Sequence, residues 1–380
     1  MIPNNNEPLI SSIPILSFFT GGGFLDMGFE EAGFDIAWTN EFSSDFADIY
    51  ESGITSWRHA RRAKSPDAKI SNRKSVTELT ADSIMREAFG SVRPQLFGVI
   101  GGPPCVDFSV GGRNDGANGT NGRLIRVFGD LINDLKPDFF IIENVPGLWK
   151  MKKHKAFLKN VIKRLRNKPY RYRICTKIVS SLELGVPQNR ERLFVVGFSD
   201  NLIGDSLKKQ NLPNPFEWFT WPQPIYPDVR KLPWPSKCSF NGSPALPEDI
   251  PIELTVYPLL VGPPNPANIP NGNEFFKPYS SKFDQIDEGD DSRKSFKRLH
   301  RYRFSPTVWY GHNEVHLHPW EPRRLSVREA LRIQTVPDTY ILPEESSLTA
   351  KFKLITNGVP CKLAWAIANS VKVFLQQIDA

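Results

Sequence analysis

The chain has 380 residues, 40% of them hydrophobic, which is enough to bury the core of one large domain or of one and a half. Its formal net charge of +7 suits a polyanionic partner, although many basic proteins bind none. No apolar run approaches the roughly 18 residues that span a bilayer, the N-terminus lacks a basic signal segment, and the four cysteines form no C-x-x-C pair. These features argue against a membrane protein, a secreted protein and a zinc ribbon, and favour a cytoplasmic protein.

Short apolar runs alternate with amphipathic stretches over the first 199 residues. We expect strands over the ranges 13–19, 36–40, 96–100, 139–142 and 192–198. Short strands of buried type separated by helical patterns predict a doubly wound α/β sheet with helices on both faces. Ligands of such sheets lie beyond the carboxyl ends of the strands, so the residues after each run are candidates for a site.

A glycine turn follows the first expected strand. Phe19 and Thr20 lead into Gly21-Gly22-Gly23, where missing side chains let a ligand approach the backbone closely. The turn does not complete a G-x-G-x-x-G signature, which disfavours a nicotinamide oxidoreductase. Glu41 and Phe42 end the next run, where a carboxylate can accept both ribose hydroxyls and an aromatic ring can cover an adenine. Together these features predict an adenosine-type cofactor; separately, a structural turn and a surface carboxylate are the alternatives.

The third expected strand runs into the segment Gly-Gly-Pro-Pro-Cys at residues 101–105. Two prolines stiffen the turn before Cys105, and a rigid turn can present a thiol at a fixed angle. A lone cysteine is more often an inert core residue, so the neighbours decide. The stretch that follows, up to Gly122, is rich in glycine and too polar for a core. We expect a mobile loop that closes over a substrate.

A carboxylate and two arginines follow at the next strand ends. Glu143 ends the fourth run, and a carboxyl held near a thiol can share a proton if burial raises its pKa. Arg190 and Arg192 are two apart before the last run, so on an extended segment both point to the same face. Their guanidinium groups can bind a base carbonyl or a phosphate. The alternatives are a surface carboxylate and a solvated strand start.

Composition changes near residue 200. Prolines interleaved with aromatics up to about residue 282 exclude helices and central strands, and predict a loop-rich second domain with short edge strands. Residues 284–303 mix acidic and basic side chains, as in a solvated connector. Ser326 and Glu329 form a helix-start box. The last segment places five apolar residues on one helical face, which we expect to pack against the N-terminal sheet: Leu363, Ile367, Val371, Phe374 and Ile378.

Two polar clusters have simpler interpretations. His312, His316 and His318 lie close to Glu314, but no other ligand set accompanies them, so we expect no metal. The strongly basic run 150–177 is typical of a solvated helix face, with phosphate tracking as the alternative.

In this order, six of these segments resemble the cytosine-5 DNA methyltransferase family of the prokaryotic restriction-modification type. The resemblance covers nearly the whole chain except roughly residues 200 to 300, and the combination is highly specific. It implies a Rossmann-like class I methyltransferase sheet with a smaller target-recognition domain. The implied division is a catalytic and cofactor-binding domain over 1–199, target recognition over 200–320, and a segment over 321–380 that returns to the catalytic domain. The matching segments are Phe19 to Gly23, Glu41-Phe42, Pro104-Cys105, Glu143 to Val145, Gln188 to Arg192, and Arg324 to Tyr340 with Asn357 to Pro360.

The resemblance also implies an activity and a set of site residues. The chain would transfer a methyl group from S-adenosylmethionine to carbon 5 of a flipped-out cytosine in a specific duplex DNA sequence, leaving S-adenosylhomocysteine. Cys105 would be the nucleophile, and Glu143, Arg190 and Arg192 would hold the cytosine. Ser109, Arg113 and Gln188 would contact DNA. The cofactor would be bound by Phe19, Thr20, Gly21, Gly23, Glu41, Phe42, Ser75, Pro103, Asn357 and Val359.

Three departures from the family pattern and three open alternatives remain. Phe24 stands where another glycine is usual, Val106 where glutamine is common, and Ser75 where an aspartate usually accepts from the adenine amino group; a serine accepts a weaker hydrogen bond than an aspartate. An RNA cytosine methyltransferase of the same fold, a catalytically silent relative and a nicotinamide enzyme are the rivals. A cognate restriction endonuclease is a plausible partner, and a monomer suffices because one flipped base needs one pocket.

Overall fold

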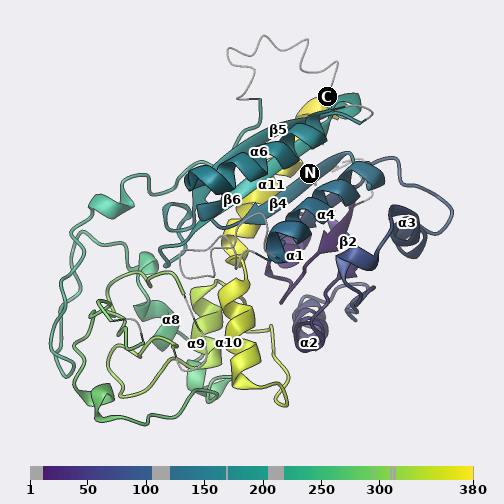
Figure 1. Cartoon of the computed structure of the whole chain (residues 1–380). Coiled ribbons are helices and arrows are strands. Elements are labelled where there is room, and N and C mark those ends of the chain that lie inside the picture. Colours follow the sequence, from purple (N-terminus) through teal and green to yellow (C-terminus); the bar gives the residue numbers. More distant parts are fainter. Residues whose placement is uncertain are drawn as a thin grey trace, which may run out of the picture.

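The computed structural model describes residues 12–104, 120–167, 170–203, 218–293, 295–308, 310 and 314–379. Figure 1 shows a region built on a β-sheet and, below it, a region of long loops with a few helices. The helices are α1 (Phe24–Glu31), α2 (Ser44–Ala60), α3 (Ala81–Phe89), α4 (Thr120–Leu135), α5 (Gly147–Lys150), α6 (Lys152–Arg166), α8 (Tyr257–Val261), α9 (Val327–Ile333), α10 (Leu348–Asn357) and α11 (Cys361–Asp379).

Six strands form one sheet in the order β2-β1-β3-β4-β6-β5. The five predicted strands are confirmed with small shifts of their ends, and a sixth, β5, was missed. Strands β1 to β4 are parallel to one another, whereas β6 pairs antiparallel with both β4 and β5. The α/β fold class is therefore confirmed, with one reversed strand in the sheet. The strands are β1 (Pro14–Phe18), β2 (Asp35–Asn40), β3 (Gly98–Gly101), β4 (Phe139–Asn144), β5 (Tyr172–Ser180) and β6 (Glu191–Ser199).

Helices cover both faces of the sheet, as predicted. One face carries α3, α4 and α6, whose apolar residues pack with Leu16, Val99 and Phe140 of the strands. The opposite face carries α1 and α11, which pack with Ile15, Ile100 and other strand residues that point the other way. The period-two alternation of a strand explains this division, because successive side chains point to opposite faces.

The C-terminal helix α11 lies behind the sheet in Figure 1, as the sequence predicted. Leu363, Ile367, Val371 and Phe374 are buried in the same core as the strands, and Ile378 packs against it while partly exposed. Burial of each such aliphatic or aromatic side chain stabilises the fold by about 1.5–3 kcal/mol. The last segment of the chain therefore belongs to the sheet region.

The core of the second region is shared with the sheet region, because Phe24 and Met27 of α1 and several residues of α2 belong to it. Residues of α2, α8, α9 and α10 form one cluster of buried side chains with Val308, Val315 and Leu325 from the loops between them. The expected short edge strands are not found: in the described part of 218–326 there are isolated bridges, such as Cys238 with Glu288, but no named strand. Short 3-10 turns occur instead: Val229–Lys231, Ile252–Leu254, Pro266–Asn268 and Ser281–Asp284.

The prediction of a solvated connector over residues 284–303 was wrong. Glu288, Arg298 and His300 are buried. Arg298 donates to the backbone carbonyls of Phe283, Ile286 and His318, and Glu288 forms an ion pair with Arg301. A run of charged side chains predicts exposure because burial of a charge is costly; here hydrogen bonds and ion pairing offset that cost.

Helix α9 begins with the capping box that the sequence predicted. The Ser326 side chain accepts a hydrogen bond from the backbone N–H of Glu329, and the Glu329 carboxylate accepts one from the N–H of Ser326. All seven residues of α9 are buried. Within the described ranges, no helix combines the length and hydrophobicity that crossing a bilayer requires.

Candidate functional site

The parallel strands β1, β2 and β3 end level with one another. Phe18 of β1 pairs with Asn40 of β2 and with Gly101 of β3, and Gly101 pairs with Ile142 of β4. The residues that follow these positions therefore meet at one edge of the sheet. Because β6 is antiparallel, it begins at this same edge, which brings Arg192 beside the end of β4.

The glycine turn forms one wall of this edge. Phe19, Gly21 and Gly23 all have positive φ angles, a conformation that glycine adopts without strain. A side chain at Gly21 would meet nothing within 4 Å, so the turn is open on that side. The Thr20 hydroxyl is buried and finds no hydrogen-bond partner among the described residues. The turn thus offers open space and an unsatisfied polar atom to a ligand.

Glu41 is tied directly to the glycine turn. One carboxylate oxygen accepts from the N–H of Gly21 at 2.9 Å and the other from the N–H of Ser43 at 2.8 Å. Burial raises the pKa of this carboxyl, while these backbone donors lower it. Each oxygen keeps a second lone pair for a further donor. Next to it, the Phe42 ring is 71% exposed, unusual for a side chain of this size.

Ser75 lies near the end of β2 but uses its hydroxyl locally. The Asn40 side chain donates to the carbonyls of Asn72 and Lys74, which holds this loop beside Glu41. The Ser75 hydroxyl accepts from the N–H of Thr77 and caps the short turn Val76–Glu78. These hydrogen bonds of Asn40 could not be predicted from the sequence, because its partners are backbone atoms 32 and 34 residues away.

The proline turn after β3 lies against Glu143. A side chain at Gly102 would come within 2.9 Å of a Glu143 carboxylate oxygen, so the absence of one permits this approach. The Asn144 side chain donates to the Pro103 carbonyl at 3.0 Å, fixing the start of the turn. The predicted nucleophile Cys105 and the predicted DNA contacts Ser109 and Arg113 lie outside the described residues.

Glu143 and Arg192 form a buried ion pair. The Nε of Arg192 is 2.8 Å from Oε1 of Glu143, and each side chain is about one-tenth exposed. Burial raises the pKa of the Glu143 carboxyl, and the charges of Arg192 and Arg190 oppose that rise. The structure thus joins two residues that the sequence placed 49 positions apart.

Arg190 is turned toward the end of α10. One of its terminal nitrogens donates to the carbonyls of Thr356 and Gly358 at 2.6 and 2.8 Å. It therefore holds the closing segment, where Asn357 is exposed and Val359 is buried against the sheet. Phe24, which replaces the usual glycine, occupies the space beside Gly358, where a side chain at that position would come within 2.2 Å of its ring.

Gln188, which the sequence predicted to contact DNA, is buried in this structure. Its side chain is fully buried and donates to the Ile333 carbonyl at 3.3 Å and to the Gln334 side chain at 3.4 Å. In this arrangement Gln188 packs the segment before β6 against the end of α9.

The histidines do not form a metal site in the described part of the chain. His316 and His318 are buried, and burial lowers the pKa of each to about 3. His318 lies 3.6 Å from Glu329, but no group of three metal-ligating side chains occurs in the described ranges. His312 lies outside them.

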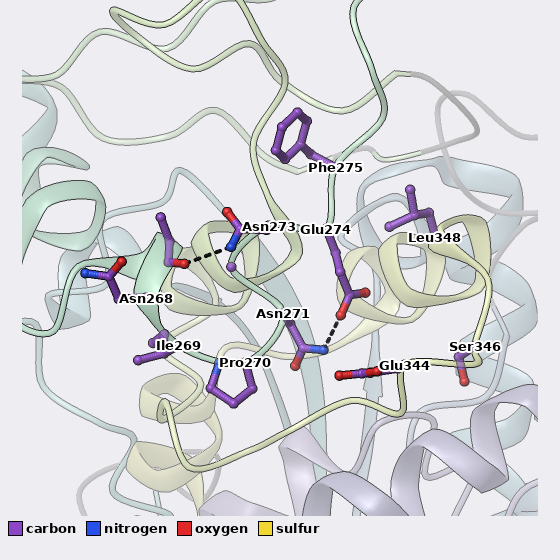
Figure 2. Close-up of a pocket in the computed structure, with 12 residues that line it drawn as sticks. Asn268, Ile269, Pro270, Asn271, Asn273, Glu274, Phe275, Glu344, Ser346 and Leu348 are labelled. Atoms are coloured by element: carbon purple, nitrogen blue, oxygen red, sulfur yellow. Dashed lines mark hydrogen bonds between the residues drawn. The ribbon is translucent and has the colours of Figure 1, made fainter.

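A surface hollow of about 660 Å³ lies elsewhere, in the loop-rich region. It is lined by residues 267–275 with Glu344, Ser346 and Leu348, and shares none of them with the strand-end site (Figure 2). Within it, the Asn271 side chain donates to the Glu274 carboxylate at 2.7 Å. The hollow is therefore a feature of the loop-rich region and is separate from the strand-end site.

Comparison with known proteins agrees with this geometry. A profile described as C-5 cytosine-specific DNA methylase matches residues 13–373. The type II methyltransferase M.NmeDI of Neisseria meningitidis serogroup C is 40% identical over 95% of this chain and 84% of its own length. M.FnuDI of Fusobacterium nucleatum is 30% identical over 94% of each.

A solved structure shares the fold. It is described as a DNA modification methyltransferase encoded within a prophage of E. coli, has a TM-score of 0.63 at 20% identity, and covers 96% of this chain and 100% of that one. The profile and the relatives show that the chain belongs to the C-5 cytosine-specific DNA methylase family and is a DNA (cytosine-5) methyltransferase.

Proposed function

We propose that this enzyme methylates carbon 5 of a flipped-out cytosine through a covalent adduct between Cys105 and carbon 6 of the base. The observation that carries the proposal is the buried Glu143–Arg192 pair beside the proline turn that leads into Cys105. This pair offers a carboxyl and a guanidinium at one place, matching the donors and acceptors on the edge of a cytosine ring. Arg190 supports the pair from the closing segment.

The strand-end residues fit S-adenosylmethionine. The open side of Gly21 and the unsatisfied Thr20 hydroxyl suit its amino-acid part, Glu41 has lone pairs for the ribose hydroxyls, and Phe42 offers an exposed ring to the adenine. Pro103, Ser75, Asn357 and Val359 complete the proposed cofactor site, with Phe19 and Gly23 shaping the turn. Bound there, S-adenosylmethionine supplies a sulfonium methyl group to the base.

The proposed reaction passes through a covalent adduct between Cys105 and the base. The Cys105 thiolate forms a bond to carbon 6, which makes carbon 5 nucleophilic; carbon 5 then takes the methyl group as the sulfonium carbon–sulfur bond breaks. A base or water removes the proton from carbon 5, and the bond from sulfur to carbon 6 breaks. Glu143 hydrogen-bonds N3 and the exocyclic amine, and Arg192 holds the O2 carbonyl, so both stabilise charge on the ring.

The substrate is proposed to be duplex DNA with its target base extruded. The reacting carbon is inaccessible within a stacked duplex, so the cytosine must leave the helix. Ser109 and Arg113 are proposed to contact the DNA as the loop closes, and the region 200–320 to read the flanking bases in the major groove. On this proposal residues 1–199 and 321–380 bind cofactor and cytosine.

The relatives suggest a biological setting. Both M.NmeDI and M.FnuDI are named type II methyltransferases. We propose that this enzyme likewise protects a short recognition sequence from a cognate endonuclease, acting as a monomer at the nucleoid.

The proposal is tested with Cys105→Ser. The hydroxyl is a far weaker nucleophile than a thiolate, so methyl transfer to duplex DNA should fall at least a thousandfold while DNA affinity stays within a few-fold of wild type. Transfer is measured with tritiated cofactor, and affinity by fluorescence anisotropy.

Cys238→Ser is the matched control, because Cys238 is a partly exposed cysteine outside the strand-end site. It should keep full activity. Turnover by Cys105→Ser equal to that of the control would reject the thiol mechanism.

A further inference from the structure

We propose that Tyr340 is a positioning residue that couples the cofactor turn to the DNA-reading region, so that cofactor and DNA each strengthen the binding of the other. The inference rests on the proposed function, in which the turn around Gly21 holds the cofactor. It assigns a role to a contact between segments 318 residues apart in the chain.

Tyr340 is held against the back of the glycine turn. Its hydroxyl donates to the carbonyl of Gly22 at 2.8 Å, and its side chain is fully buried. The ring fills the place where Gly53 of α2 has no side chain, and it makes an edge contact with Phe24 at 5.5 Å between centroids. Phe24, one of the departures from the family pattern, thus extends the contact surface between turn and ring.

The glycine turn is tightly packed on the side that faces Tyr340 and α10. A side chain at Gly22 would come within 2.5 Å of Leu354 on α10, whereas one at Gly21 would meet nothing within 4 Å. One side of the turn is therefore open to a ligand, and the other packs tightly against Tyr340 and α10. In a close-packed interior, a shift of the turn caused by a ligand must move these neighbours.

The backbone around Tyr340 leads to the loop-rich region. Arg328 of α9 donates to the Tyr340 carbonyl at 2.9 Å and to the Pro270 carbonyl at 3.0 Å. The Asn271 side chain pairs with both backbone groups of Leu342, accepting at 2.9 Å and donating at 3.0 Å. Figure 2 shows Asn271 beside Glu274 at the surface hollow. A residue that lines the hollow is therefore hydrogen-bonded to the segment that carries Tyr340.

Helix α9 joins more of the loop-rich region to the same segment. Arg332 donates to the carbonyls of Leu259 and Pro264 and forms an ion pair with Asp338, two residues before Tyr340. Through α9, the stretch from α8 to Phe275 is therefore hydrogen-bonded to the segment that contacts the glycine turn. If this stretch adjusts when DNA binds, the adjustment reaches Gly22 through Tyr340.

Such coupling has a thermodynamic signature that simple structural support lacks. If cofactor raises the affinity for DNA by a given factor, DNA must raise the affinity for cofactor by the same factor. A residue that only stabilises the fold would change the melting temperature and leave this factor alone. The factor is therefore the quantity to measure.

The test compares Tyr340→Phe with the control Ser52→Ala. The first variant removes only the hydroxyl that reaches Gly22. The second removes a hydrogen bond of 3.1 Å to Ile341, the next residue, without touching the turn. Affinity for S-adenosylhomocysteine is measured by calorimetry with and without a duplex carrying the recognition sequence, and affinity for that duplex with and without S-adenosylhomocysteine.

In wild type, each ligand should tighten the other by the same factor. Tyr340→Phe should cut that factor about threefold to tenfold, which is the worth of one buried hydrogen bond, and Ser52→Ala should preserve it. The absence of coupling in wild type, or an unchanged factor in Tyr340→Phe, would overturn the proposal.

Two further variants separate the possible failures. If Tyr340→Phe does not fold, Asn271→Gly gives the same readout at the other end, because Asn271 has a φ of +65° that glycine accepts without strain. Glu41→Gln tests the cofactor site itself. Weakened binding of S-adenosylhomocysteine in Glu41→Gln with unchanged coupling in Tyr340→Phe would reject this inference alone; unchanged binding in Glu41→Gln would reject the proposed cofactor site.

Discussion

Asp26 is the buried carboxyl that lies closest in the chain to the glycine turn. It sits in the first turn of α1 and accepts hydrogen bonds from Ser17 of β1 at 2.6 Å and from Tyr50 of α2 at 3.0 Å. Tyr50 in turn packs where Gly23 has no side chain. Burial raises the pKa of Asp26 to about 7, against the effect of the two hydroxyl donors. One carboxyl thus ties together the three elements that frame the turn.

We predict that Asp26→Asn removes a pH dependence of stability. The folded pKa of about 7 exceeds the ordinary value of 3.8, so the folded protein binds this proton more tightly than the unfolded chain. The resulting stabilisation is complete below about pH 3.8 and is lost as pH rises through about 7. Relative to Asp26→Asn, wild type should lose up to about 1.4 kcal/mol of unfolding free energy per pH unit in that window. Urea unfolding of both proteins from pH 5 to 8 measures this; parallel stability curves would contradict it.

Residue types at strand ends were predictable, but several of their partners were not. The sequence indicated Glu41, Glu143 and Arg192 because a polar residue after a buried strand lies where ligands bind. It could not indicate Asn40, whose role is a hydrogen bond to backbone atoms of a distant loop. The same limit applies to Gln188, whose hydrogen bond to the Ile333 carbonyl joins residues 145 positions apart.

At the scale of elements, α1 and α11 pack closely against each other. A side chain at Gly28 of α1 would come within 2.5 Å of both the Ala364 side chain and the Trp365 backbone nitrogen. Glycine in a helix interior costs about 1 kcal/mol relative to alanine. The lack of a side chain at Gly28 lets the C-terminal helix α11 pack closely against α1.

We predict that Gly28→Ala lowers the unfolding free energy by about 1–3 kcal/mol, because overpacking against a backbone atom outweighs the gain in helix propensity. Gly129→Ala on α4 is the control. Its new side chain would meet only a Val161 methyl group at 2.9 Å, which can adjust, so the loss should be smaller. Chemical denaturation measures both. Equal or greater stability of Gly28→Ala would show that α11 docks more loosely than described.

Strand β5 shows how an element was missed. Tyr172 and Ile174 point into one core and Cys175 and Val179 into the other, while Arg173 is partly exposed and Lys177 exposed on this edge strand. The alternation of tyrosine and arginine from residue 170 to 173 was a readable strand signal. The basic character of the whole run from 150 to 177 masks it, because such a run as a whole is typical of a solvated helix face.

At the scale of the whole molecule, the excess of basic residues is concentrated on α6. This helix carries lysines and arginines on its exposed side and no acidic residue, and the ion pair of Arg164 with Asp130 leaves most of them without a carboxylate partner in the described chain. Its buried side packs through Phe157, Leu158 and Leu165. The helix starts two residues after α5 at the strand-end edge, so its charges extend from the site across the sheet.

We predict that α6 contributes to the salt dependence of DNA binding. Each lysine that neutralises a phosphate adds about 0.9 to the slope of log affinity against log salt. Replacing Lys159 and Lys163 by glutamine should therefore lower the slope by about 1–2. The control is Lys372→Gln, because Lys372 lies on α11 at the opposite face of the sheet. Titrations from low to moderate salt measure the slopes. An unchanged slope in the α6 variant would show that these lysines do not contact DNA phosphates.

The sheet region could be predicted almost completely, and the loop-rich region only in its composition. Strand periodicity and glycine turns are local signals, and they located five of the six strands. The fold of residues 218–326 instead depends on long-range pairings of buried charges, such as Glu288 with Arg301 and Arg298 with backbone carbonyls. Such pairings leave no periodic pattern in a single sequence.

The central claim, covalent catalysis by Cys105, is tested most directly with duplex DNA that carries 5-fluorocytosine at the target position. Fluorine cannot leave as a proton does, so the reaction should stop at the adduct. We predict a denaturation-resistant complex that forms only with S-adenosylmethionine, whose mass is that of one chain, one DNA and one methyl group, and whose DNA-linked peptide contains Cys105. Methyl transfer to ordinary cytosine without any such complex, or a complex linked at another residue, would contradict the account.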